Sequence, residues 1–154
     1  MAITGSVQGI LNGKDFEGSS MLYSILIYGT DADIANLSKA EEERLIGQHI
    51  VVQGKLAAER KLGPVVRLHP STTAMTLRKG PEAYIIDGPF AETKEQLLGF
   101  YVVDCATQEE ALEAARMIGG ACTSRALEVR PISWFQLTDS IDHSKAAVRV
   151  EPKP

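Results

Sequence analysis

The chain has 154 residues, 44% of them hydrophobic and 23% charged, which suits one globular domain with a buried core. A net charge of −4, with Lys and Arg scattered singly, provides no basic stripe for phosphates, so direct nucleic-acid binding is not expected. No apolar run approaches the ~20 residues that span a bilayer, and the cysteines are few, so the sequence predicts a cytoplasmic protein without a membrane segment.

The first half of the chain predicts an arm, a strand and a long helix. Residues 1–20 are rich in Gly and Ser and predict a poorly ordered N-terminal arm. MLYSILIYG, which starts at residue 21, predicts a strand over residues 22–28. Ser38 with Glu41 is a capping-box pair, and Gly63 before Pro64 is a stop signal, so a helix is expected over residues 38–61.

The second half predicts more strands and a second helix. VVRLHP, TAMTLR and AYIIDG predict a meander whose third strand ends at Asp87. GFYVVDC predicts a strand over residues 99–105, and Thr107 with Glu110 predicts the start of a helix that stops at Gly119. RALEVRPI predicts an edge strand over residues 125–132, followed by a C-terminal extension over residues 133–154.

This order of elements predicts an α+β fold, a ferredoxin-like antiparallel sheet with two helices on one face. The strands over residues 22–28 and 99–105 are apolar on both sides, so both faces of the sheet need cover. Two helices cover only one face. We therefore expect a second copy of the chain on the other face, in a homodimer with the sheets face to face.

The stretch DGPFAETKEQLLGFYVVD, residues 87–104, closely resembles the signature of the YCII-related family, in its DGPF branch. The resemblance extends from MLYSILIYG to EVRPI, so it places the family domain at residues 21–132. It implies a dimeric α+β barrel and an enzymatic site with a paired His and Asp, which here correspond to His49 and Asp87. Some relatives carry sigma-factor modules, which implies a link to transcription initiation, but this chain contains no such module.

His49 is the first candidate for chemistry. It lies on one stripe of the long helix with Leu45, Val52 and Leu56, so it should point toward the core. A neutral imidazole oriented by the Asp87 carboxylate could act as a general base near neutral pH. A core histidine satisfied by a backbone carbonyl would show the same pattern, and the sequence leaves both interpretations open.

The loop after Asp87 supplies the other candidates. Phe90 either fills the core beneath the turn or contacts a ligand, Lys94 could bind an anionic substrate, and Tyr28 could reach the same cavity. Gly88 and Pro89 have the chemistry of a turn. His69 and His143 lack a ligand spacing, and no nucleotide or cofactor fingerprint is present, so neither a metal nor a cofactor is expected.

Two functions follow. The first is a small cofactor-independent enzyme in which His49 and Asp87 transfer a proton, in an isomerase- or lyase-type reaction, on an organic molecule held in the barrel cavity. The second is a non-catalytic ligand-binding or regulatory module linked to transcription initiation. The sequence does not decide between the enzyme and the binding module.

Overall fold

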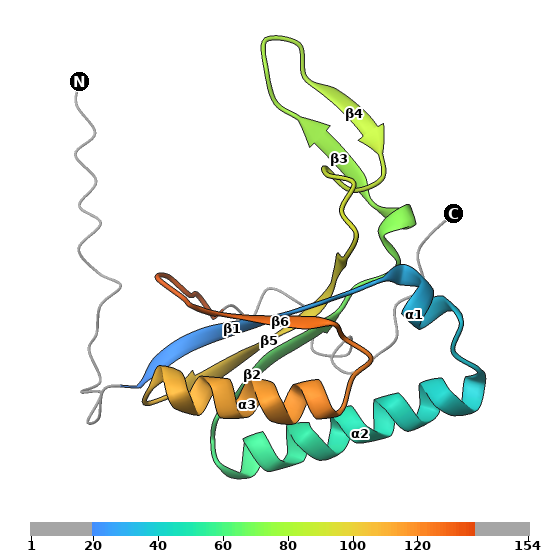
Figure 1. Ribbon diagram of the computed structural model, residues 1–154. Helices are drawn as coiled ribbons and strands as arrows, with labels where there is room; N and C mark the ends of the chain where they lie inside the picture. The colour runs from blue at the N-terminus through green and yellow to red at the C-terminus, as the bar shows by residue number, and fades with distance from the viewer. Residues whose placement is uncertain (1–19, 138–154) are drawn as a thin grey trace, which may run out of the picture.

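The computed structural model describes residues 20–137, and its centre is a four-stranded antiparallel sheet (Figure 1). Its strands are β1 (Met21–Gly29), β2 (Leu62–Arg67), β5 (Gln96–Cys105) and β6 (Ala126–Pro131), in the spatial order β2-β5-β1-β6. The α+β class and the four strands are confirmed. The predictions for residues 1–19 and 138–154 lie outside the described residues.

Two long helices, α2 (Lys39–Ala58) and α3 (Gln108–Gly120), lie on the same side of the sheet (Figure 1). Alternate residues of the central strands point toward them, because successive side chains of a strand point to opposite faces. The core between helices and sheet contains residues of both layers, among them Ile25, Leu56, Tyr101, Val103 and Ile118.

The start of α2 follows the prediction, but its end does not. Ser38 is the N-cap, and its side chain and that of Glu41 form the expected reciprocal capping box. The helix ends at Ala58, and Arg60 then takes the left-handed conformation at φ 58°. The prediction that Gly63 and Pro64 stop the helix is wrong, because both residues lie in β2. Pro is tolerated there because β2 is an edge strand.

Other predictions at the element ends hold in part. Thr107 caps α3 as expected, but the Glu110 carboxylate accepts from the backbone N–H of Ala106, and the helix continues one residue past Gly119. Pro131 ends β6, which lies at the other edge of the sheet as predicted. The short helix α1 (Asp31–Ala35), capped by Thr30, was not predicted.

The predicted three-stranded meander is wrong. Only β3 (Met75–Arg78) and β4 (Tyr84–Asp87) pair with each other, as a separate hairpin after the 3-10 turn η1 (Ser71–Thr73), whereas β2 pairs with β5. Figure 1 shows this hairpin rising from the sheet on the side opposite to α2 and α3. The Asp31 carboxylate, which accepts from the backbone N–H and the hydroxyl of Ser71, fastens the base of the hairpin to α1.

We call the sheet face that points away from the helices the open face. In β1 it carries the residues that alternate with the core, and in β5 it carries their cross-strand neighbours. Its apolar members in these two strands are Leu22, Leu26, Tyr28, Leu97, Phe100 and Val102. In the described part of the chain no helix covers this face (Figure 1).

Candidate functional site

His49 lies on α2 in the stripe that faces the sheet, as the sequence predicts. Leu45, Val52 and Leu56 of this stripe are buried, and His49 is half-buried. Its Nδ1 atom lies 2.7 Å from the hydroxyl oxygen of Tyr101 on β5, and the two rings are stacked with centroids 5.9 Å apart. The imidazole is therefore held by the sheet.

Tyr101 is the residue that the sequence did not identify. Only 1% of it is exposed, and its register opposite Ile25 puts its ring on the helix-covered face. A buried tyrosine hydroxyl needs hydrogen-bond partners, and Tyr101 has two, His49 and the Gln53 amide, whose Nε2 donates over 3.3 Å. The signal in the sequence was a tyrosine in the middle of an otherwise apolar strand.

The hydrogen bonds around Tyr101 favour one tautomer of His49. Since Gln53 donates to the phenol oxygen, the phenol proton is available for Nδ1 of His49. With the Gln53 amide oriented as it is in the structure, the opposite arrangement, with Nδ1–H donating to Tyr101, would leave the buried phenol proton without an acceptor among residues 20–137, and an unpaired buried donor costs about 1 to 3 kcal/mol. The neutral ring then carries its proton on Nε2, which is not bonded to Tyr101.

Both rings are neutral near pH 7. Burial, and after it the positive charge of Arg67, lower the pKa of His49 from its ordinary value near 6.5. Burial also raises the pKa of the Tyr101 phenol, while the hydrogen bond from Gln53 acts in the opposite direction. The site therefore presents an uncharged, oriented imidazole beside a cationic guanidinium.

Asp87 lies elsewhere. It ends β4, is exposed, and is the cross-strand partner of Met75 in the hairpin. Within residues 20–137 no hydrogen bond joins Asp87 to His49, which is bonded to Tyr101. The β3-β4 hairpin, which carries Asp87, and α2, which carries His49, lie on opposite sides of the sheet (Figure 1). The pairing of His49 with Asp87 stays a prediction.

The DGPF turn after Asp87 is bonded to the hairpin. Gly88 has φ of 95°, a conformation that favours glycine, and its N–H donates to the Ala74 carbonyl. The Thr76 hydroxyl donates to the Gly88 carbonyl, and Arg78 donates to the carbonyl of Phe90. The functional groups of this loop thus include several that fix the turn itself.

The remaining predicted ligand contacts also lie away from His49. Tyr28, near the end of β1, is half-buried and alternates with the core residue Ile27, so it belongs to the open face. Phe90 is 69% exposed, so the expectation that it fills the core is wrong. Lys94 is exposed in the loop before β5. The structure therefore separates His49 from the other predicted site residues.

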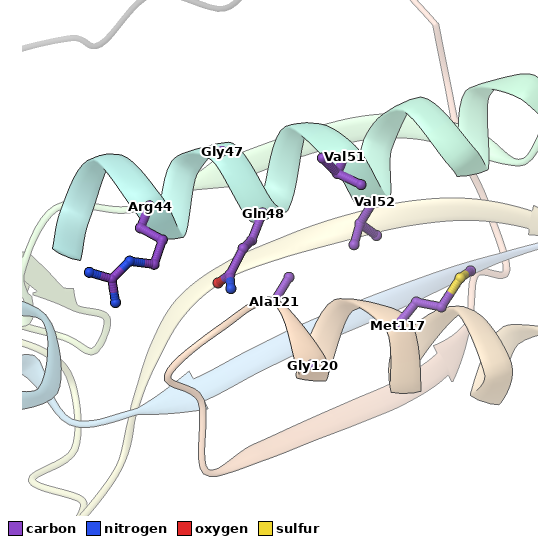
Figure 2. Close-up of a pocket in the computed structure, with 8 residues that line it drawn as sticks. All are labelled: Arg44, Gly47, Gln48, Val51, Val52, Met117, Gly120 and Ala121. Atoms are coloured by element: carbon purple, nitrogen blue, oxygen red, sulfur yellow. The ribbon is translucent and has the colours of Figure 1, made fainter. Parts of the chain in front are cut away.

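A shallow hollow of about 530 Å³ lies on another side of α2, between α2 and the end of α3 (Figure 2). Val52 and Ala121 are its buried floor, Gln48 points from α2 toward Ala121 at the end of α3, and Arg44 of α2 also lines it. None of the predicted site residues lines it. It offers apolar contact and hydrogen bonding.

Residues 20–137 contain no group of three or more His, Cys, Asp or Glu side chains that could hold a metal ion. Their helices include none that is long and apolar enough to cross a membrane. Cys105 and Cys122 are both free thiols.

Comparison with known proteins decides the family. A model of the YCII-related domain matches residues 21–135, from the start of β1 to beyond the end of β6. The chain belongs to the YCII-related domain family. It is also 48% identical, over 118 residues, to the uncharacterized protein R00369 of Rhizobium meliloti (strain 1021), which covers 75% of this chain and 95% of that protein.

The match confirms the family that the DGPFAETKE stretch predicted. In this YCII-related domain, both the His49–Tyr101 contact and the hairpin that ends at Asp87 lie inside the matched residues. Assignment to the DGPF branch in particular stays a prediction that rests on the motif.

Proposed function

We propose that this YCII-related protein is a small enzyme, independent of any cofactor, that promotes proton transfer on an organic substrate in an isomerase- or lyase-type reaction. His49 is its catalytic residue. The observation that carries the proposal is the 2.7 Å contact between Nδ1 of His49 and the Tyr101 hydroxyl, which orients a neutral imidazole at the surface of the core.

The chemistry follows from the tautomer. When a solvent water molecule or hydroxide ion takes a proton from a carbon next to a carbonyl group, negative charge develops on the carbonyl oxygen. A neutral imidazole with its proton on Nε2 can donate to that oxygen and stabilise the charge, as neutral histidines do in other enzymes. Tyr101 and Gln53 are positioning residues, since they fix the ring without touching the substrate.

The test is exchange with solvent deuterium. The protein is incubated in D₂O with a panel of small ketones and keto acids, and NMR follows deuterium incorporation beside the carbonyl. We expect exchange of at least one compound, and His49→Gln should slow it by roughly a hundredfold or more. His69→Gln, a matched change at an exposed position after β2, should leave the rate within about twofold.

Exchange that is as fast in His49→Gln as in the wild type would contradict the proposal. If no compound exchanges and a ligand binds equally well to His49→Gln, the alternative is favoured. That alternative is a ligand-binding or regulatory module, linked by the family resemblance to transcription initiation. It is supported by the position of Asp87, Tyr28, Phe90 and Lys94 away from His49, where they could contact a ligand without its participation.

We further propose that two copies associate through their open faces to form a dimeric α+β barrel. Leu22, Leu26, Tyr28 and Phe100 of that face are half-buried in the single chain, which supports this assembly. The hairpin supports it as well, because an isolated two-stranded hairpin is only marginally stable. Its apolar side chains are exposed in the single chain, and Ile85 is 67% accessible.

A further inference from the structure

A row of polar groups runs along the edge of the helix layer, between α2 and β2. We call it the polar lane and define it as Glu42, His49 and Gln53 of α2 with Arg67 of β2. The three helical residues have the spacing i, i+7 and i+11, which places them on one side of α2. Arg67 Nη2 reaches this side and lies 3.3 Å from Glu42 Oε1.

The backbone explains how Arg67 reaches the helix. Val65 is the partner of Tyr101, and two residues later Arg67 is the partner of Gly99, so Arg67 shares the helix-covered face with Tyr101. A Cβ atom on Gly99 would lie 2.2 Å from the Val66 carbonyl oxygen, so only glycine fits opposite Arg67. No β5 side chain therefore stands between the guanidinium and α2.

Arg67 retains donors for a solute. Its side chain is 47% exposed, and in the described chain its one ion pair is the single-oxygen contact with Glu42. A guanidinium has five N–H donors, so this contact leaves most of them facing solvent. An exposed ion pair of this kind contributes little to stability, so the pairing of Arg67 with Glu42 stabilises the fold only slightly.

The charge of Arg67 makes the electrostatic potential at His49 more positive. The positive charge of Arg67 lowers the His49 pKa, after the larger effect of burial. An anionic oxygen placed at Nε2 would therefore meet a hydrogen-bond donor in a positive field. These are the conditions under which a charge-assisted hydrogen bond is strong.

We propose that Arg67 and Nε2 of His49 together bind an anionic oxygen of the substrate, and that the substrate is a small organic carboxylate or the enolate formed from it. This inference deepens the proposed function, on which it rests for the role of His49. The Glu42 carboxylate holds the Arg67 guanidinium in the polar lane until the substrate anion displaces it.

Binding of propionate and of its neutral isostere propionamide, followed by NMR through the His49 ring signals, tests the proposal. Propionate should bind saturably, and propionamide roughly tenfold more weakly or not at all. Arg67→Gln should weaken propionate binding by about tenfold or more, and Arg67→Lys should weaken it less, because a lysine keeps the charge but not the planar donors. Glu42→Gln should tighten it severalfold, since it frees Arg67.

Arg116→Gln is the matched control, because Arg116 is an exposed arginine on α3 whose ion pairs are with Glu109 and Glu113. It should change propionate binding by less than about twofold. Equal binding of propionate and propionamide, or propionate binding unchanged in Arg67→Gln, would overturn the inference. The measurement needs no turnover, so an anion site without deuterium exchange would refute only the proposed enzyme, and exchange independent of Arg67 would refute only the anion site.

Discussion

At the scale of single residues, the tautomer and orientation of the His49 ring depend on the Tyr101 hydroxyl group. Tyr101→Phe removes it and leaves Nδ1 of His49 and the Gln53 amide without their shared partner. We expect the free energy of unfolding to fall by about 1 to 2 kcal/mol, as measured by urea denaturation. Tyr84→Phe, at an exposed position in the hairpin, should change it by less than about 0.5 kcal/mol. Equal effects of the two changes would mean that the Tyr101 hydroxyl is not engaged.

Burial of His49 also makes stability depend on pH. Its pKa is lower in the folded chain, mainly through burial and secondly through Arg67, so the unfolded chain binds the proton more readily. Above the pKa of His49 in the unfolded chain, near 6.5, the ring is neutral in both the folded and the unfolded state, so its protonation does not change the free energy of unfolding. As the pH falls below that value, stability should be lost until the folded pKa is passed.

The measurement is urea denaturation at pH 7.5 and at pH 5.5. The wild type should lose more stability between the two than His49→Gln does, because glutamine has no proton to gain. Arg67 of β2 and the neutral Tyr101 of β5 are the groups that face the ring, and neither changes charge in this range. A larger loss in His49→Gln than in the wild type would show that His49 is not buried as a neutral group.

At the scale of elements, the DGPF turn depends on a glycine. Gly88 has φ of 95°, where a side chain is strained although no neighbour would clash with it. Gly88→Ala should destabilise the hairpin by about 1 kcal/mol, which would lower the hydrogen-exchange protection of the β3 and β4 amides roughly fivefold. Gly80→Ala is the control, since Gly80 has open space and no positive φ. Similar losses in both variants would contradict the role of the turn conformation.

The elements also show what sequence patterns can predict. The capping residues Ser38 and Thr107 mark the starts of both long helices, because caps act locally. The end of α2 could not be predicted in this way, since Gly63 and Pro64 are a stop signal that the fold uses inside an edge strand. The pairing of β2 with β5 depends on contacts between distant segments, which no local pattern encodes.

The candidate site, like the helices and strands, could be predicted only in part from the sequence. The helical stripe around His49 gave its direction, since that signal is periodic. Tyr101 was not identified, because GFYVVDC is apolar on both sides and does not reveal which face the helices cover. Asp87 was expected to close a strand beside the inward stripe of the long helix, but it ends β4 in the separate β3-β4 hairpin.

At the scale of the whole molecule, the account predicts a homodimer. Among the described residues no helix covers the apolar open face, and the apolar side chains of the hairpin are exposed (Figure 1). Light scattering at micromolar concentration should give a mass of about twice the 16.7 kDa of one chain. Leu26→Lys, which places a charge on the open face, should shift the mass toward that of one chain. Ile50→Lys, on the exposed side of α2, should leave the dimer intact. A wild type that is a clean monomer would contradict the barrel.

The central claim is that Tyr101 holds His49 neutral, with its proton on Nε2, ready to donate to a substrate oxygen. The most direct measurement is a long-range ¹H–¹⁵N correlation spectrum of the histidine rings at pH 7.5, assigned with His49→Gln. We expect a protonated Nε2 and an unprotonated Nδ1 for His49, and we expect this preference to be lost in Tyr101→Phe. A ring protonated on Nδ1, or charged at this pH, would contradict the claim.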